Sequence, residues 1–419
     1  MHPDPKHAVL LVIGAGPAGL MAALGAARSG ARVIVFEQLP EAGVKLLATG
    51  GGHCNFTNTL ATADFIRRFG AQGRFVAPAL KAMNGAKLRL FFDELGAPSH
   101  SPDGFHVFPA SDSAQSIRNA LLQACEKLGV EFRYNSGVES LRIERGQVAG
   151  LVTSRGTESA TWVVLAAGGA GYPNLGGGEG GYKLARRAGH MIVPLCPALV
   201  PLVTRETWPG KLAGITLPRV AVRLVCADES GTAGPGSLLF THKGISGPVV
   251  LDISGMVSAA LLARESVGIA LDLDPDRTTE EWENILEQAR REHGARTVLS
   301  VLGSTLPAAL ARVVLELAEV PPSMRVAQLA REPGRRVIGM IKALPLVIAQ
   351  TEGFGKAMAT RGGIKLDEVW PKTLESKLVR GLVFAGEILD VDGPCGGFNL
   401  QWAFASGFLA GGLFAISCE

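Results

Sequence analysis

Three glycines and one acidic residue near the N-terminus have the spacing of a dinucleotide-binding loop. Residues 14–19 read Gly-Ala-Gly-Pro-Ala-Gly, a complete GxGxxG, and Glu37 follows about 20 residues further on. In such a loop the first glycine permits a tight turn, the second lets the backbone approach a pyrophosphate, and the third lets a helix pack on a strand. A carboxylate at Glu37 would accept hydrogen bonds from the adenosine ribose. The pattern predicts a nucleotide site that suits either NAD or FAD.

The elements that must position this loop can be recognised on both sides of it. Residues 8–13 are an apolar run typical of a buried parallel strand, residues 20–29 are expected to form a helix that ends at Gly30, and residues 32–36 a second strand. The helix N-terminus would offer unpaired N–H groups and the positive end of its dipole to phosphates. No second fingerprint occurs in the sequence, so we expect no separate NAD(P)H domain and little direct reduction by NAD(P)H.

Glycine is concentrated in a few other places. The 53 glycines cluster at 50–52, 168–181 and 386–397 as well as in the N-terminal loop, and the last two clusters follow apolar, strand-like runs. Clustered glycines mark backbone that turns sharply or approaches a ligand closely. We therefore expect one extended ligand that is contacted from several loops.

Composition excludes several functional classes. Hydrophobic residues make up 47% and charged residues 19% of the chain, as in a soluble globular protein, and the net charge of +3 comes without a basic run interleaved with aromatics. We therefore expect no nucleic-acid partner. The longest apolar stretch, 402–416, is shorter than the roughly 20 residues of a membrane span and contains glycines. It predicts a buried helix and no membrane association.

Cysteine usage and the N-terminus bear on location. The six cysteines, at positions 54, 125, 196, 226, 395 and 418, include no CxxC, which argues against a zinc site or a disulfide framework. No charged segment followed by a long apolar run opens the chain, so a secretory signal is not expected. The interpretation is a cytoplasmic protein without a metal.

Several segments together resemble the YhiN/BaiN-type bacterial flavoproteins, a family similar in its flavin fold to the fumarate reductase and glutathione reductase flavoproteins. These segments span nearly the whole chain: GAGPAGLMAA, KLLATGGGHCNFTN, AAGGAGYPNLGGGEGGYKLA, LLFTHKGISGP and GLVFAGEILDVDGPCGGFNLQWAFASG. The resemblance implies an α/β fold, with a two-part Rossmann-like FAD-binding domain that carries an inserted β-rich subdomain and a small helical subdomain. It also implies FAD as the cofactor.

The resemblance assigns parts of FAD to particular residues. Lys45 and the loop 50–58 would line the isoalloxazine and ribitol, Val138 would meet the adenine through its backbone, and Gly386 with Glu387 would reach the ribitol. The helix that begins near Asn399 would point its positive end at the flavin pyrimidine. The full set implied for FAD binding is Gly14, Ala15, Gly16, Pro17, Ala18, Gly19, Glu37, Gln38, Lys45, Gly51, Gly52, His53, Cys54, Asn55, Thr57, Val138, Ala167, Gly168, Gly169, Gly386, Glu387, Gly396, Gly397, Phe398 and Asn399.

Two of these positions depart from the pattern of the resembled proteins. His53 stands where those proteins usually have arginine in GGGRCN, and Glu387 replaces the aspartate that is commoner in related folds.

A change in the kind of expected elements, first to short strands and then to helices, predicts the domain limits in the middle of the chain. We expect the FAD-binding domain at 1–193 and 344–419, a β-rich cap at 194–275 and a helical subdomain at 276–343. The strands expected in the cap are 199–204, 220–227, 237–240, 249–253 and 266–273. An insert over a flavin is a natural substrate cap, because pockets favour domain interfaces.

Few side chains are candidates for proton transfer. His242, in the loop 240–248, is our catalytic candidate, and the competing interpretation is a histidine that only holds its own loop. We expect His53 to contact the cofactor and His106 to be structural, close to a helix start at 109–112. Cys54 and Cys395 could form a redox pair, or both could be ordinary small buried residues.

The expected function is an oxidoreductase that moves a hydride between flavin N5 and an unidentified small organic substrate. Reduction of an activated C=C or C=O bond and oxidation of a small amine both remain open. The alternatives are an FAD-dependent RNA-modifying enzyme and a flavin-binding sensor without turnover.

Overall fold

The computed structural model describes residues 9–225, 231–264 and 266–413, which form two compact units. Unit 1 comprises the described parts of 1–196 and 358–419, and unit 2 comprises those of 197–357. Cys226, Cys418 and the polar N-terminus up to residue 8 lie outside the described residues. Within the described ranges, no helix is long and apolar enough to cross a membrane.

A parallel sheet at the centre of unit 1 joins strands from both ends of the chain. Its order is β19 (Leu382–Phe384), β10 (Trp162–Leu165), β1 (Val9–Ile13), β2 (Arg32–Phe36) and β6 (Glu131–Arg133). Every neighbouring pair is parallel. Strands β1, β2, β10 and β19 are nearly continuous apolar runs, which is typical of a sheet covered on both faces, whereas the edge strand β6 reads Glu-Phe-Arg. The two-part Rossmann fold expected from the sequence is therefore confirmed.

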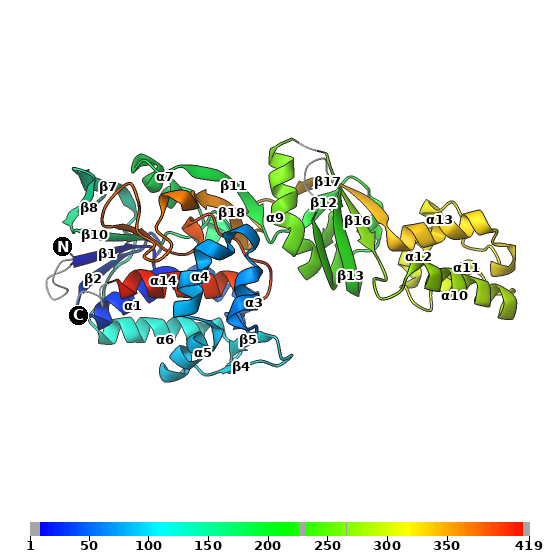
Figure 1. Cartoon of the computed structure of the whole chain (residues 1–419), viewed down its shortest axis with the longest axis horizontal. Helices are drawn as coiled ribbons and strands as arrows, with labels where there is room; N and C mark the ends of the chain where they lie inside the picture. The colour runs from blue at the N-terminus through cyan, green and yellow to red at the C-terminus, as the bar shows by residue number, and fades with distance from the viewer. Residues whose placement is uncertain (1–8, 226–230, 265, 414–419) are drawn as a thin grey trace. The chain divides into compact units, whose positions relative to one another are not determined.

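Two helices from opposite ends of unit 1 lie against each other (Figure 1). A side chain placed at Gly407 of α14 (Phe398–Gly412) would come within 2.2 Å of the Ala18 carbonyl oxygen in α1 (Pro17–Arg28). At Gly411 the corresponding distance, to the Ala22 carbonyl oxygen, is 2.4 Å. The glycines of the apolar C-terminal stretch thus let two helix backbones touch, and the buried helix predicted there is confirmed over its described part.

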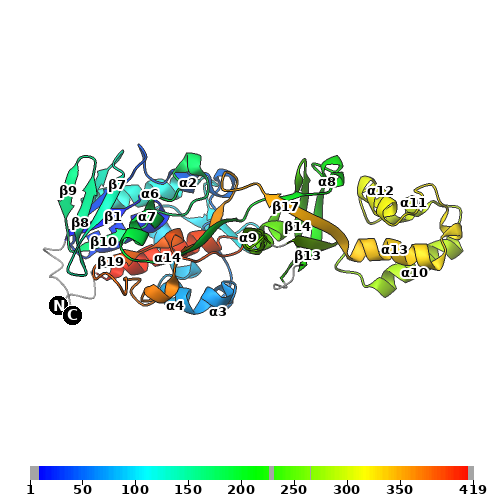
Figure 2. The ribbon, with the colours of Figure 1, turned by 90° about the horizontal axis from the view of Figure 1, so that it is seen from above.

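The remaining elements of unit 1 surround this core. The short antiparallel sheet β3-β5-β4 follows the second glycine cluster, and the β7-β8-β9 sheet lies at the left of Figure 2. Their bounds, with those of the other helices and strands, are α2 (Val44–Leu47), β3 (Thr57–Asn58), α3 (Thr62–Arg67), α4 (Gly73–Ala82), α5 (Gly85–Glu94), β4 (Ser99–His100), β5 (His106–Pro109), α6 (Ala114–Lys127), β7 (Val138–Glu144), β8 (Gln147–Thr153), β9 (Gly156–Ser159), α7 (Gly180–Arg187), β11 (Ile192–Ala198) and β18 (Ala359–Ile364).

Unit 2 contains a closed barrel and a group of helices. The barrel order is β12 (Leu202–Thr204), β15 (Gly244–Ser246), β14 (Thr232–Thr241), β13 (Thr216–Val225), β16 (Val267–Asp272) and β17 (Leu344–Thr351). The helices are α8 (Trp208–Lys211), α9 (Pro248–Leu262), α10 (Thr279–Glu292), α11 (Val298–Leu302), α12 (Ala308–Leu317) and α13 (Arg331–Lys342).

The structure differs from the sequence interpretation at two places in unit 2. The segment 249–253, expected as a strand, lies in α9, where Pro248 occupies the first helical turn and favours a helix start. The segment from 344, expected to return to the FAD-binding domain, instead forms β17, which pairs with β12 and β16. Alternate residues of β17 are buried, as in a strand with one face toward a barrel core. Unit 1 resumes at Met358.

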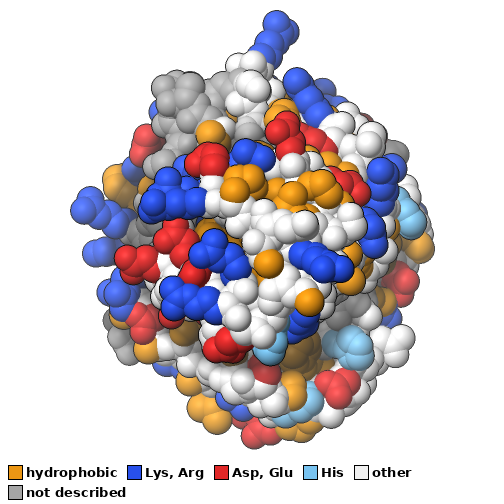
Figure 3. Space-filling view, turned by 90° about the vertical axis from the view of Figure 1, so that its right-hand side faces the viewer, with side chains coloured by type: hydrophobic (Ala, Val, Ile, Leu, Met, Phe, Trp, Pro, Cys, Tyr) orange, Lys and Arg blue, Asp and Glu red, His pale blue; other side chains and the backbone are white. Residues whose placement is uncertain are grey.

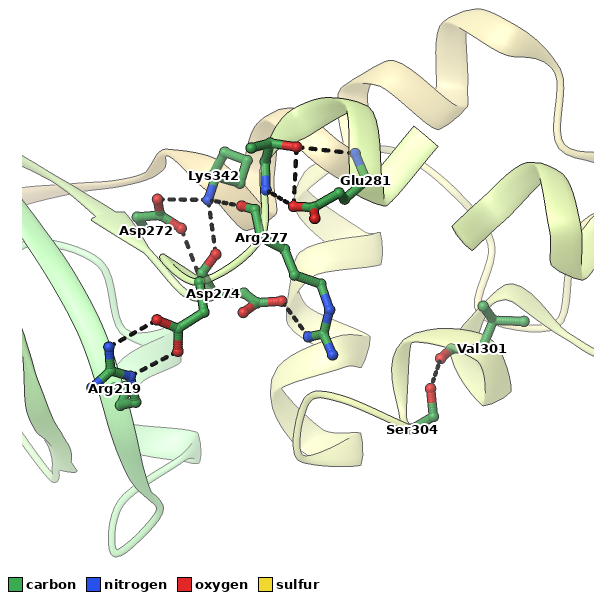
Figure 4. Close-up of polar contacts among 10 residues, drawn as sticks. Arg219, Asp272, Asp274, Arg277, Glu281, Val301, Ser304 and Lys342 are labelled. Atoms are coloured by element: carbon green, nitrogen blue, oxygen red, sulfur yellow. Dashed lines mark hydrogen bonds and ion pairs between the residues drawn. The ribbon is translucent and has the colours of Figure 1, made fainter. Parts of the chain in front are cut away.

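Lys342 joins the helices of unit 2 to its barrel (Figure 4). Its ammonium lies 2.7 Å from the Asp272 carboxylate at the end of β16. It also donates to the backbone carbonyls of Asp274, at 2.8 Å, and Arg277, at 2.6 Å. One side chain at the end of α13 therefore fixes the segment that leads from β16 into α10.

Candidate functional site

The glycines of the N-terminal loop have different structural roles. A side chain at Gly19 would lie 1.9 Å from the Gly14 carbonyl oxygen, and one at Gly14 would lie 2.5 Å from the Ala166 carbonyl oxygen. Gly14 also has a φ of 99°, which disfavours other residues. A side chain at Gly16 would meet no atom within 4 Å. Gly14 and Gly19 are thus required by packing, whereas Gly16 borders open space.

The start of α1 is arranged to bind an anion. Gly16 is its N-cap and provides no side-chain cap, and Pro17 occupies the first helical turn. The unpaired N–H groups that follow and the helix dipole favour negative charge at this point. The open space at Gly16 lies at the same helix end, so the residues present fit a pyrophosphate.

Glu37 at the end of β2 holds the glycine loop. Its Oε2 accepts a hydrogen bond from the Ala15 N–H at 2.8 Å, and its Oε1 accepts one from the Leu39 N–H at 2.9 Å. The side chain is almost fully buried. A carboxylate has further lone pairs, so the predicted ribose contact is compatible with these bonds.

A second polar cluster joins distant parts of unit 1. Lys45 Nζ of α2 lies 2.9 Å from Glu387 Oε2, just beyond β19. Glu387 Oε1 accepts a hydrogen bond from the Thr360 N–H at 2.8 Å, and the Ala170 N–H donates to Thr360 Oγ1 at 2.8 Å. A side chain at Gly169 would lie 2.5 Å from the Glu387 carboxylate. The glycine clusters after β10 and β19 therefore meet around Glu387.

The glycine segment before α14 packs against β3. Asn58 Nδ2 donates to the Gly396 carbonyl at 2.8 Å, and a side chain at Gly397 would lie 2.6 Å from the Thr57 carbonyl oxygen. Asn399 closes the segment, because its amide accepts from the Gly393 N–H and donates to the Gly393 carbonyl, both at 2.8 Å. Gly397, the N-cap of α14, has no side-chain cap. The first N–H groups of this helix, like those of α1, therefore receive no hydrogen bond from an N-cap side chain.

Several residues predicted to contact the cofactor also have partners within the protein, and their contacts with FAD stay predictions. The Phe398 ring is buried 4.4 Å from that of Phe65, so it belongs to the core. Gln38 Nε2 donates to the Gly176 carbonyl at 3.0 Å, and the Val107 N–H donates to Asn55 Oδ1 at 3.3 Å. His53 is exposed, and its Nδ1 lies 2.9 Å from the Asp112 carbonyl oxygen.

The other predicted positions lie in loops or strand ends of unit 1. Gly51 and Gly168 have positive φ values and open space where a side chain would be. Gly52 also has a positive φ, whereas Ala167 lies beside Gly181, and Val138 is the first residue of β7. A contact between each of these residues and FAD stays a prediction.

Cys54 is unsuited to redox chemistry in this environment. The side chain is completely buried, and burial raises the pKa of its thiol to about 12, although a hydrogen bond with Thr49 lowers it. The thiolate is the reactive form of cysteine. The reading of Cys54 as an ordinary buried residue is therefore favoured over a redox pair with Cys395.

The structure places the candidate histidines His242 and His106 in different units. His242 is exposed in the turn between β14 and β15 of unit 2, and its catalytic role stays a prediction. His106 is on strand β5, and helix α6 begins only after Ser113, its N-cap. His106 Nδ1 lies 2.5 Å from Asp103 Oδ2. Sequence reasoning missed Asp103, although an Asp-x-x-His spacing could have drawn attention to it.

Sequence reasoning also missed a partly buried acidic pair, Asp390 and Asp392, beside the last glycine cluster. Arg361 Nη1 of β18 lies 3.5 Å from Asp392 Oδ2, and Gln72 Nε2 donates to the Asp390 carbonyl at 2.8 Å. Burial raises the pKa of both Asp390 and Asp392. The repeated acids in ILDVDG were the available signal.

Comparison with known proteins identifies related sequences and folds. The profile of the family described as "HI0933-like protein Rossmann domain" matches residues 8–413. A "3-dehydro-bile acid delta(4,6)-reductase" of Clostridium scindens is 33% identical over 96% of this chain and 97% of its own length. A "ribosomal RNA dihydrouridine synthase" of Haemophilus influenzae is 33% identical over 95% of this chain and 96% of its own.

A solved structure shows the same fold. A flavocytochrome c3 fumarate reductase superposes with a TM-score of 0.51 at 18% identity, covering 98% of this chain and 78% of its own. At this identity the likeness extends to the fold alone.

Proposed function

This chain belongs to the HI0933-like family of Rossmann-fold flavoprotein oxidoreductases, and from this premise we propose that it uses FAD to reduce a carbon–carbon double bond conjugated to a carbonyl group. The proposed substrate is a small organic molecule. The flavin would supply the hydride from N5, and the protein would bind both partners and manage one proton.

The observation that carries this proposal is the chemistry shared by the names of two relatives. A delta(4,6)-reductase of a 3-dehydro-bile acid acts on double bonds conjugated to a ketone. A dihydrouridine synthase saturates the uracil double bond, which is conjugated to a ring carbonyl. In both reactions a hydride and a proton would add across a double bond that is conjugated to a carbonyl group. We therefore assign this chain to the same reaction class, the reduction of a double bond that is conjugated to a carbonyl group.

The site geometry supports FAD as the cofactor. The uncapped start of α1, with open space at Gly16, would receive the pyrophosphate, and Glu37 would face the adenosine ribose. Lys45 and Glu387 would lie at the ribitol, between the two glycine clusters that meet there. The uncapped start of α14 would favour negative charge on the flavin pyrimidine.

The test begins with the purified protein. Heat release and chromatography would identify the chromophore, with FAD expected. The flavin would then be reduced with dithionite without oxygen and mixed with a 4-en-3-one steroid, with the saturated 3-ketone as the matched control. We expect the enone alone to restore the oxidised flavin spectrum and to be recovered saturated. Reoxidation by neither compound, across a panel of enones, would contradict the reductase assignment but not FAD binding.

The second candidate is the same chemistry on a uridine of RNA, because a relative bears that name. The net charge of +3, and the interleaving of basic with acidic side chains on the face in Figure 3, give it little electrostatic support. The expectation of no nucleic-acid partner stays a prediction. Reoxidation of the reduced flavin by a uridine-containing ribosomal RNA fragment, with dihydrouridine formed, would favour this candidate. A flavin that no acceptor reoxidises would favour the sensor.

A further inference from the structure

We propose that His106, oriented by Asp103, delivers the proton that accompanies hydride transfer. This inference rests on the proposed function, because it assigns the proton donor of that same reaction. His106 would be the catalytic residue, and Asp103 would be a positioning residue that acts through it.

Asp103 makes one hydrogen bond with the imidazole of His106 and two with the backbone beside it. One carboxylate oxygen, Oδ1, accepts hydrogen bonds from the backbone N–H groups of Phe105, at 2.9 Å, and His106, at 2.8 Å. The other, Oδ2, lies 2.5 Å from His106 Nδ1. Both ends of the carboxylate are therefore fixed to the strand that carries the histidine, and the ring direction is set with them.

These bonds also decide which ring nitrogen carries a proton. The hydrogen bond from His106, followed by the backbone bonds, holds the pKa of Asp103 well below its usual range. An ionised carboxylate only accepts hydrogen bonds, so His106 Nδ1 must be the donor. Nε2 is then the nitrogen available to a substrate, and no partner for it occurs among the described residues. This division between an oriented Nδ1 and a free Nε2 is what acid–base catalysis by histidine requires.

The pairing of β3 with β5 places His106 on the same face of the small sheet as Asn58. Asn58 of β3 is directly opposite His106 of β5, so the two side chains project from the same face of the small sheet. The Asn58 amide uses that face to reach the Gly396 carbonyl. Phe105, whose ring centre is 4.9 Å from the His106 ring, would lie 3.1 Å from a side chain at Gly396. His106 thus lies next to two residues, Asn58 and Phe105, that contact the glycine segment preceding α14.

Two other histidines of unit 1, His190 and His100, are less suitable. His190 is buried and uses both nitrogens, Nδ1 with Glu368 and Nε2 with Ser376. His100 binds Asp112 through Nε2, the nitrogen that a substrate would need. Only part of the His106 side chain, 39%, is exposed. It can therefore exchange protons with water while the rest of the ring stays supported.

The proposed step is balanced in atoms and electrons. The substrate accepts a hydride from the reduced flavin at its β carbon, and the π electrons of its double bond move toward the α carbon and carbonyl. The α carbon takes a proton from the Nε2–H of protonated His106, so that a second C–H bond forms and neutral imidazole remains. His106 regains a proton from water. An external two-electron donor restores the reduced flavin.

The first test compares two acceptors in variants of the FAD-loaded protein. We expect His106→Gln to slow reoxidation of the reduced flavin by an enone by about 100-fold, the lower end for lost acid catalysis. Reoxidation by ferricyanide, which needs no proton on carbon, should be unchanged. His100→Gln is the matched control on the same sheet, since it too is paired with an aspartate. Wild-type enone rates in His106→Gln, or equal slowing in His100→Gln, would overturn the proposal.

The second test does not depend on turnover. Nitrogen-15 NMR would locate the proton on His106, identified by the signal that His106→Gln lacks, before and after FAD is added to apoprotein. We expect the Nδ1–H form, a signal that moves when FAD binds, and a shift of the proton toward Nε2 in Asp103→Asn. If the wild type reduces no enone, the proposed function fails. The NMR experiment would still decide whether His106 lies close to bound FAD. A signal unaffected by FAD would overturn the proposal.

Discussion

Lys45 and Glu387 lie 2.9 Å apart, although 342 positions separate them in the chain. Lys45 follows the second strand of the central sheet, and Glu387 follows β19, the last strand to join it. Glu387 also accepts the Thr360 N–H, which brings in β18. The pair thus closes the FAD-binding fold at the point where its N-terminal and C-terminal parts meet.

Loss of this pair should weaken FAD binding more than folding. In Lys45→Met, Glu387 would keep its charge with one fewer partner, close to the proposed ribitol position. We expect FAD affinity to fall about tenfold, which corresponds to roughly 1.4 kcal/mol, as measured by quenching of flavin fluorescence during titration of apoprotein. Arg32→Ala, which removes an exposed 3.6 Å pair with Glu131, should leave the affinity unchanged. Equal affinities in Lys45→Met and wild type would contradict this role.

The glycine loop offers a matched pair of substitutions. Gly19→Ala would place a methyl group 1.9 Å from the Gly14 carbonyl oxygen, so we expect poor folding and a reduced yield. Gly16→Ala meets no protein atom and has an ordinary φ of −79°, so the protein should fold. The methyl group would, however, stand where the pyrophosphate is proposed, and FAD affinity should fall at least tenfold. Melting temperature and FAD titration separate the two outcomes; a Gly16→Ala protein with full affinity would argue against this placement.

The sequence predicted those parts of the fold that are specified by neighbouring residues in the chain. The strand–glycine–helix–strand order fixes the start of unit 1, and the apolar stretch with Gly407 and Gly411 predicts a buried helix. What local patterns could not supply was partners at long range. The alternating residues of β17 have the same pattern in a barrel as in an edge strand, and only its pairing with β12 and β16 assigns it to unit 2.

In the candidate site too, features set by the local backbone were predictable, whereas contacts between distant residues were not. Glycine positions were predictable because each reflects a local backbone requirement, as at Gly14 and Gly397. Side-chain roles were less so: no local pattern indicated that Phe398, whose contact with the flavin stays a prediction, packs on Phe65. His106 was expected to be structural because a helix start was expected at 109–112, and its pairing with Asn58 of another strand could not be predicted from local patterns.

Cys54 should react slowly in the native protein. Burial raises the pKa of its thiol to about 12, so only a very small fraction is thiolate at neutral pH. We expect iodoacetamide to modify Cys54 only after unfolding, as followed by peptide mass spectrometry, and Cys54→Ala to leave the rate of flavin reduction unchanged. Rapid native labelling, or slower flavin reduction in Cys54→Ala, would restore the redox interpretation.

His190 should make stability depend on pH. Burial lowers its pKa below the usual 6.5, against the raising effect of Glu368. The unfolded chain then binds a proton that the folded state resists, so the free energy of unfolding should fall as pH drops below 6.5. His190→Gln should flatten this part of the curve, measured by urea unfolding on both sides of that pH. The raised pKa values of Asp390 and Asp392 act in the opposite direction, because they favour the folded state as pH falls. Both residues are present in the wild type and in His190→Gln, so the comparison cancels their effect. Parallel curves for the two proteins would refute the assignment.

Lys342 should couple the helices of unit 2 to the barrel. Its ammonium is mostly buried and neutralises Asp272 while it satisfies two backbone carbonyls. Lys342→Met keeps the length of the side chain but leaves these groups unpaired, at a cost of about 1–3 kcal/mol. We expect faster hydrogen exchange in α10 and α13, with β13 and β14 little affected, because local opening starts where contacts are lost. Arg291→Ala is the matched control, since it removes a charged pair with Glu287 in which the arginine is 76% exposed. It should leave exchange in α13 unchanged. If Lys342→Met exchanges like the wild type, the helices must be held by their apolar contacts alone.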